Sequence, residues 1–148
     1  MPRKGAGGFL SFIIMATPSS HDIDLITLTS RDYIEGWFTA DAERMQRCLH
    51  PDLVKRTLIH DPAKETWRLY RPSNAEMMVE FTRKGGGSDI PEAEQTYEII
   101  IQDVFRHIAS VKVISRYLMD YLHLVKLNER WFIVNVLWEL REGEIGPE

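Results

Sequence analysis

Along the N-terminal third of the chain, apolar side chains repeat at the period of a helix. The positions on one face of this predicted helix are Tyr33, Ile34, Trp37 and Phe38. Thr29 and Asp32 resemble a capping box, so we expect the helix to begin near Ser30. Gly36 lies inside the helix and is expected to let a neighbouring helix approach closely.

Shorter patterns predict two more helices with a hairpin between them. Asp41 is placed to cap a second helix, which Pro51 ends. Ser73 and Glu76 form another capping box, and the helix after them is expected to stop at the glycines of residues 85–87. Residues 53–59 and 66–70 have the composition of paired strands.

Strand-like segments then continue almost to the end of the chain. They predict four strands in succession, over residues 97–105, 109–117, 119–127 and 130–140. Consecutive strands joined by short turns pair as an antiparallel meander. Helices followed by such strands predict the α+β class, with a curved antiparallel sheet wrapped around the N-terminal helices.

The last two strands can be paired residue by residue through a two-residue turn at Asn128 and Glu129. Because side chains alternate along a strand, this register defines two faces. The face that we expect to line a pocket carries Met119, Tyr121, His123, Val125, Phe132, Val134, Val136 and Trp138. The opposite face carries Asp120, Leu122, Leu124, Lys126, Trp131, Ile133, Asn135 and Leu137. We expect the opposite face to bind a second copy of the chain, because apolar patches on monomers are usually covered.

Composition narrows the range of functions. A chain of 148 residues with 44% hydrophobic residues suits one domain with a substantial core. The net charge is −4 and no basic stripe is visible, so we expect no nucleic acid partner. No apolar segment is long enough to span a membrane. Cys48 is the single cysteine, which excludes an internal disulfide, and we expect a cytoplasmic protein.

The first residues leave two interpretations open. Arg3 and Lys4 precede an apolar run over residues 9–16, as in a secretory signal, whereas a natural start at Met15 would make residues 1–14 an extension. We expect a flexible N-terminal extension over residues 1–22, one domain over residues 23–142, and a C-terminal tail over residues 143–148.

Two segments of the chain resemble a known family. The segment YIEGWFTADAERMQRCLHPDLVKR is similar to the putative lumazine-binding family of the nuclear transport factor 2-like superfamily, and DYLHLVKLNERWFIVN is similar to its closing hairpin. The resemblance implies a cone-shaped α+β fold whose pocket takes a small apolar or heterocyclic ligand. Because the superfamily holds both enzymes and non-catalytic binding domains, the fold alone does not select the function.

Ketosteroid isomerases of the same superfamily allow a comparison by residue. Tyr33 matches their oxyanion-binding tyrosine, and His123 stands at the position of their protonated carboxylic acid. Trp138 matches an indole of their steroid site. Their general base corresponds to Thr57, which cannot act as that base. The resemblance therefore implies a possible donor pair without the matching base.

We expect one internal pocket, formed by the first helix and the sheet. Its predicted ligand-binding residues are Tyr33, Trp37, Thr57, Tyr121, His123, Val134 and Trp138. The candidate catalytic residues are Tyr33, His123 and Asp103, the last if its face of the strand points inward. A structural role also stays open, in which Tyr33 packs on the sheet and bonds His123 through its hydroxyl.

Two function hypotheses follow from these residues. The chain is either a non-catalytic small-molecule-binding domain, or a lyase, isomerase or cyclase acting on a cyclic ketone or polyketide-like substrate. The missing base at Thr57 favours the binding domain. We expect no cofactor and no metal site, since the spacing of the histidine and acidic residues at 50–52 and 60–61 matches no zinc pattern.

Overall fold

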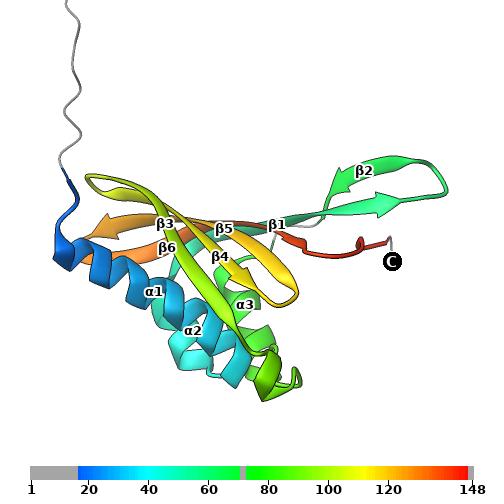
Figure 1. Ribbon diagram of the computed structural model, residues 1–148, viewed down its shortest axis with the longest axis horizontal. Helices are drawn as coiled ribbons and strands as arrows, with labels where there is room; N and C mark the ends of the chain where they lie inside the picture. Colours follow the sequence, from blue (N-terminus) through cyan, green and yellow to red (C-terminus); the bar gives the residue numbers. More distant parts are fainter. Residues whose placement is uncertain (1–16, 71–72, 147–148) are drawn as a thin grey trace, which may run out of the picture.

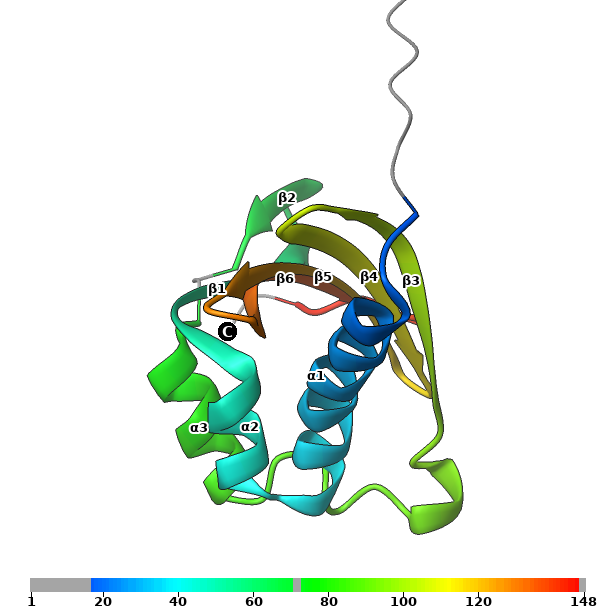
Figure 2. The same cartoon turned by 90° about the vertical axis from the view of Figure 1, so that its left-hand side faces the viewer.

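The computed structural model of the protein describes residues 17–70 and 73–146. Within them, helices cover one face of a curved six-stranded sheet (Figures 1 and 2). The helices are α1 (Ser20–Thr39), α2 (Ala42–Cys48) and α3 (Ala75–Arg83), with a short 3-10 helix η1 (Glu92–Glu94). The strands are β1 (Leu49–Asp61), β2 (Thr66–Leu69), β3 (Tyr97–Phe105), β4 (Ile108–Ser115), β5 (Leu118–Leu127) and β6 (Arg130–Leu140). The α+β class predicted from the sequence is confirmed.

The sheet is mixed, whereas the sequence analysis predicted an antiparallel one. Its strand order is β2-β1-β6-β5-β4-β3, and β3 to β6 form the predicted meander. β1 pairs antiparallel with β2 but parallel with β6. A parallel pair needs a long crossover connection, here the whole segment from β2 to β5, so local sequence patterns do not reveal it.

Helix α1 begins ten residues earlier than predicted, at Ser20. Its N-cap is Ser19, whose Oγ accepts a hydrogen bond from the Asp22 amide at 3.0 Å. Thr29, the predicted cap, lies inside the helix and donates its hydroxyl to the Leu25 carbonyl. Ser20–Asp22 therefore belong to the domain, which corrects the predicted boundary at residue 23. Residues 1–16 of the predicted extension lie outside the described residues.

The starts of the other two helices follow the predicted pattern, but α2 ends at Cys48 and not at Pro51, which lies in β1. Asp41 caps α2, accepting a hydrogen bond from the Arg44 amide. The cap of α3 is Asn74, one residue after the predicted Ser73. A Cβ at Gly36 would lie 3.3 Å from the backbone nitrogen of Met45, so glycine permits the close packing of α1 on α2.

The turn between β5 and β6 is the predicted one. Asn128 and Glu129 have φ values of 48° and 64°, as a two-residue turn with two left-handed positions requires. Leu127 pairs with Arg130 beside the turn, as expected. The predicted register of the hairpin is therefore confirmed at the end nearest the turn.

Farther from the turn, an irregularity in β6 shifts the predicted pairing by one residue. His123 was expected opposite Val134 but pairs with Asn135. An extra residue in one strand of a pair is a β-bulge, and it moves every later side chain to the other face. As a result, Asp120 is the partner of Trp138.

In β5, and in β6 as far as Ile133, the helices cover the face that the sequence analysis assigned to a dimer contact, so that part of the assignment is wrong. Beyond the irregularity in β6, Trp138 lines the cavity and Leu137 is exposed, as predicted. Buried side chains of the helix-covered face are Val111, Val113, Leu122, Leu124, Trp131, Ile133 and Val136. The opposite face carries Tyr121 and Leu137, which are 42% and 50% exposed. Both faces of the hairpin are apolar in sequence, so alternation alone did not determine which one turns inward.

Candidate ligand-binding cavity

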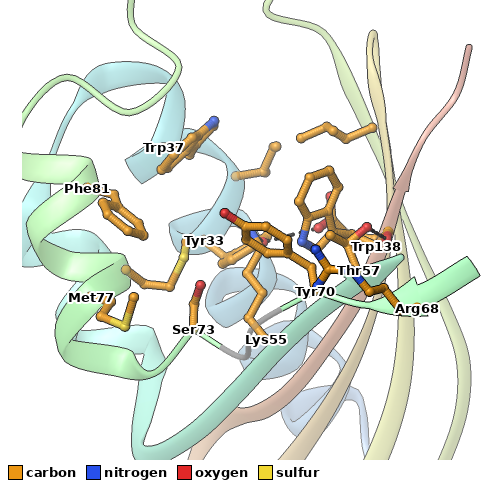
Figure 3. A pocket seen from close by; sticks show the side chains of 14 residues that line it. Tyr33, Trp37, Lys55, Thr57, Arg68, Tyr70, Ser73, Met77, Phe81 and Trp138 are labelled. Atoms are coloured by element: carbon orange, nitrogen blue, oxygen red, sulfur yellow. Dashed lines mark hydrogen bonds between the residues drawn. The ribbon is translucent and has the colours of Figure 1, made fainter. Parts of the chain in front are cut away.

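A cavity of about 710 Å³ lies between the helices and the sheet (Figure 3). Its walls come from α1, α3 and four strands, which brings together residues far apart in sequence. The lining residues are Tyr33, Ile34, Trp37, Lys55, Thr57, Arg68, Tyr70, Ser73, Met77, Met78, Phe81, Leu118, Asp120 and Trp138. Four of the predicted ligand-binding residues, Tyr33, Trp37, Thr57 and Trp138, are among them.

Large apolar side chains form most of the wall. Trp37 and Trp138 approach the cavity from α1 and β6, and Met77 and Phe81 approach it from α3 (Figure 3). Met77 and Phe81 are 41% and 44% exposed. A concave site with apolar walls and few polar groups is typical of small-molecule binding.

The loop after α3 holds Trp37 in place. The Gly87 amide donates to the Trp37 carbonyl at 2.9 Å. A Cβ at Gly87 would lie 2.7 Å from Trp37 Nε1, and one at Gly86 would lie 2.6 Å from the Trp37 carbonyl oxygen. The glycines predicted to end the helix thus also leave the space that the indole occupies.

Three polar side chains form a hydrogen-bonded chain in the cavity wall. Lys55 Nζ donates to the Tyr33 hydroxyl oxygen at 2.8 Å, and the Tyr33 hydroxyl donates to Asp120 Oδ1 at 3.1 Å. Asp120 is 1% exposed, and its Oδ2 has no hydrogen-bond partner among the described residues. A buried carboxyl oxygen without a partner is costly, so Asp120 is an unusual residue for a purely structural position.

Burial shifts the pKa of each member of this chain towards its uncharged form. It raises the pKa of Asp120, while the nearby Lys55 ammonium and the Tyr33 hydrogen bond oppose the rise. It lowers the pKa of Lys55, and the attraction of Asp120 opposes that change. The pKa of Tyr33 is well above its ordinary value, because of burial and then the adjacent carboxyl, so its phenol keeps its proton.

Lys55 also lies among aromatic rings. Its Nζ is 5.3 Å from the ring centroid of Tyr33, 5.7 Å from that of Trp37 and 5.5 Å from that of Trp138. Ring faces attract a cation at these distances. No carboxylate among the described residues lies within 4.0 Å of Lys55 Nζ, so its amine is not committed to a direct ion pair.

Thr57 lines the cavity but its hydroxyl is engaged elsewhere. Thr57 Oγ1 donates to the Trp138 carbonyl at 2.6 Å, between the paired strands β1 and β6. The side chain is 2% exposed. Thr57 therefore helps to shape the cavity wall and to join β1 to β6. This agrees with the sequence argument that no general base lies at this position.

The structure places three predicted site residues away from the cavity. Tyr121 and His123 are exposed on the uncovered sheet face, because β5 turns Asp120 and its alternate neighbours inward. Val134 lies at the bulge and, with His123, borders a separate groove on the uncovered face. The predicted pocket role of these three residues is wrong, and so is the predicted contact between Tyr33 and His123.

Asp103, the predicted base, is also outside the cavity. The pairing of β3 with β4 shifts between Ile101 and Asp103, which breaks the alternation that placed both on one face. Asp103 is exposed and borders the groove on the uncovered face. It therefore has no access to the residues around Tyr33.

Sequence reasoning missed two residues of the polar chain, Lys55 and Asp120. Asp120 did carry a signal, since it shares its strand face with Leu122 and Leu124, and an acid on an apolar face is unusual. Lys55 carried no such signal, since lysine is usually exposed, yet it points into the cavity (Figure 3).

In residues 17–70 and 73–146, no group of three histidine, cysteine or acidic side chains is placed to hold a metal ion. In the same residues, no helix is long and apolar enough to cross a membrane.

Solved structures of low sequence identity share this fold. A nuclear transport factor 2-like protein of unknown function from Silicibacter pomeroyi DSS-3 matches 84% of this chain and 100% of its own, with 16% identity and a TM-score of 0.64. A similar protein of unknown function from Methylobacillus flagellatus KT matches 85% of this chain and 97% of its own, with 20% identity and a TM-score of 0.62. These matches support the nuclear transport factor 2-like fold and no specific activity.

A domain of unknown function from Nostoc punctiforme, described as having a cystatin-like fold, also matches, at 13% identity and a TM-score of 0.53. The match covers 85% of this chain and 81% of that domain. No curated protein matches the chain. The model of the family described as "Putative lumazine-binding" matches residues 21–139, which include all of the described helices and strands except the first residue of α1 and the last residue of β6. The chain therefore belongs to the putative lumazine-binding family, with a nuclear transport factor 2-like fold.

Proposed function

We propose that this protein binds a small, flat, largely apolar molecule whose polar edge meets Asp120, Tyr33 and Lys55. The observation that carries the proposal is the buried carboxyl of Asp120, a residue that lines the cavity and whose Oδ2 has no partner among the described residues. The volume of about 710 Å³ supports it, since ligand sites usually enclose about 300–1,000 Å³.

The arrangement of donors and acceptors suggests the chemistry of the ligand. A carbonyl oxygen would accept from Lys55, whose ammonium has donors left after its bond to Tyr33, and a ring N–H beside it would donate to Asp120. Heterocycles such as lumazine carry C=O and N–H groups side by side on a flat ring. The name of the family is in keeping with such a ligand.

Titration of the purified protein with lumazine tests the proposal, with quenching of tryptophan fluorescence as the measurement. Asp120→Asn should weaken binding by about tenfold, the equivalent of about 1.4 kcal/mol, because one buried hydrogen bond is altered. Asp103→Asn is the matched control, since it removes an exposed carboxyl outside the cavity. Equal affinities for the two variants, or no binding by the wild-type protein, would count against the proposal.

A second candidate function is that of a lyase, isomerase or cyclase acting on a cyclic ketone. The Tyr33 hydroxyl and a protonated Asp120 would polarise a carbonyl group, which supports it. The absence of a base at Thr57 argues against enolisation at that position. Exchange of the α-protons of 2-tetralone in D₂O, followed by NMR, tests this candidate. Exchange no faster with wild-type protein than with Asp120→Asn would reject it.

We further propose that the chain forms a homodimer through the uncovered sheet face. Phe105, Ile108, Tyr121 and Leu137 lie there, each between 42% and 55% exposed. A two-fold axis would bury this patch from both copies at once. Light scattering should give twice the mass of 17.2 kDa, and Leu137→Glu should reduce it to that of a monomer. A monomeric wild-type protein would contradict this proposal.

The compartment remains the predicted one, the cytoplasm. The free Cys48 is buried, and burial raises the pKa of its thiol, so the residue suits a structural role in a reducing compartment. Cell fractionation with an antibody against the protein checks this, and recovery outside the cytoplasmic fraction would contradict it.

A further inference from the structure

Lys55 has features beyond those that a binding site needs. Its amine borders a cavity with apolar walls, close to the rings of Tyr33, Trp37 and Trp138, and no carboxylate of a described residue pairs with it directly. A lysine in apolar surroundings is the type of residue that acts as an amine nucleophile.

The hydrogen-bonded chain lets the proton of Lys55 move without any change in total charge. The Tyr33 hydroxyl accepts from Lys55 Nζ at 2.8 Å and donates to Asp120 Oδ1 at 3.1 Å. If Lys55 gives a proton to Tyr33 while Tyr33 gives its own to Asp120, an ammonium and a carboxylate become an amine and a carboxylic acid. Burial favours this uncharged pair, because it lowers the pKa of Lys55 and raises that of Asp120.

We propose that Lys55 captures the carbonyl group of an aromatic aldehyde or ketone in the cavity as a Schiff base, with Tyr33 and Asp120 supplying the protons. This inference rests on the proposed function, since the carbonyl compound must first bind in the cavity. It adds a covalent step and names the ligand class as carbonyl compounds. The aromatic rings of Trp37 and Trp138 select a flat ligand.

The chemistry balances with the groups present. The Lys55 nitrogen attacks the carbonyl carbon and a C–N bond forms, while the C=O π bond breaks. The nitrogen then gives one of its two protons to the former carbonyl oxygen, which yields a carbinolamine. The Asp120 proton, passed through Tyr33, converts the hydroxyl group into leaving water, and the nitrogen lone pair forms the C=N bond. The amine, the carbonyl compound and the carboxylic acid thus become a protonated imine, one water and a carboxylate. Nothing is oxidised or reduced.

Reductive trapping with 2-naphthaldehyde tests the inference on the full chain. Sodium borohydride reduces any imine to a stable amine, which intact mass spectrometry counts and peptide mapping locates. We expect one adduct for each chain, on Lys55, formed before any other lysine reacts. Lys55→Arg should lose this adduct and keep its charge, whereas Lys112→Met should retain it. Lys112 is a matched control because its Nζ lies 6.0 Å from the Tyr121 ring, on the sheet face away from the cavity.

The variant Asp120→Asn tests whether Schiff-base formation at Lys55 depends on a proton from Asp120, or whether Lys55 reacts without that help. It should slow trapping by about 10²-fold, the usual effect of losing a positioned acid. An unchanged rate would remove Asp120 and Tyr33 from the inference.

Binding of 2-naphthalenemethanol, which has no carbonyl group, separates this inference from the proposed function. If the alcohol quenches tryptophan fluorescence in the wild-type protein and in Lys55→Arg, but the aldehyde labels Lys55 no faster than other lysines, the Schiff base is refuted and the binding site stands. If neither the alcohol nor the aldehyde binds, the proposed function fails and the inference fails with it.

Discussion

Replacing Tyr33 with phenylalanine removes one oxygen atom from the centre of the buried polar chain. The ring of Tyr33 is 3% exposed, so phenylalanine keeps the same shape in the same packing. The two groups that the hydroxyl joins, Lys55 and Asp120, stay in place. The variant therefore tests the hydrogen bonds themselves, separate from the volume of the side chain.

The expected cost comes mainly from Asp120. Asp120 Oδ1 loses its donor, Oδ2 has no partner among the described residues, and the side chain is 1% exposed. A buried polar group left without a partner costs about 1–3 kcal/mol. Lys55 adds little, because it is only partly buried and water in the cavity can replace the phenol. We expect Tyr33→Phe to lower the free energy of unfolding by about 1–3 kcal/mol.

Urea unfolding measures this change, with tryptophan fluorescence and circular dichroism as independent probes. The matched control is Tyr121→Phe, which removes a hydroxyl from a tyrosine that is 42% exposed and should change stability by less than about 0.5 kcal/mol. A double-mutant cycle with Asp120→Leu adds a second test. Once Asp120 is gone, Tyr33→Phe should cost less, with a coupling of about 0.5–3 kcal/mol.

Two results would refute the reasoning. If Tyr33→Phe and Tyr121→Phe have the same stability, the Tyr33 hydroxyl does not satisfy a buried group. If the double-mutant cycle shows additive effects, Tyr33 and Asp120 do not interact, and the proton path from Lys55 is removed as well.

Three further predictions concern the pH dependence of stability, the packing of Trp37 against Gly87, and ketosteroid isomerase activity. Since burial raises the pKa of Asp120 above 3.8, the folded chain keeps a proton that the unfolded chain releases, so the contribution of Asp120 to stability falls as pH rises from about 3.8 through its higher pKa in the folded chain. Asp120→Asn should remove this fall in urea titrations across pH. Gly87→Ala should displace Trp37 and shift its fluorescence, whereas Gly146→Ala, with no atom within 4 Å of the new Cβ, should not. We expect no turnover of a β,γ-unsaturated ketosteroid above background, because Thr57 provides no base; robust turnover would contradict this.

Local features of the fold were readable from the sequence. The Asp41 cap and the Asn128-Glu129 turn depend on contacts within four residues, so the residue types there specify the geometry directly. The strand segments β3 and β6 also have the predicted bounds. The resemblance of the segment around Tyr33 to the putative lumazine-binding family identified the superfamily fold correctly.

The start of α1 was predicted wrongly because a local capping pattern was outweighed by contacts between the helix and the sheet. Thr29 and Asp32 fit a capping box, but Ser19 supplies the actual cap. Contacts with the sheet extend the helix beyond its predicted start, since Asp22 accepts a hydrogen bond from Trp131 Nε1 at 2.9 Å and pairs with Lys126. Tertiary contacts of this kind override a local capping signal.

The candidate site depended on tertiary structure for a specific reason. Alternation along a strand predicts faces only while the register is regular, and single extra residues near Asp103 and Val134 reverse the faces beyond them. Both faces of the last hairpin are apolar, so the choice of inner face depended on how the helices pack. The sequence by itself determined the elements and the presence of Tyr33, Trp37 and Trp138 near a pocket. Only the folded sheet, with β1 beside β6, brought Lys55 and Asp120 to the same phenol, because long-range pairing leaves no local pattern in the chain.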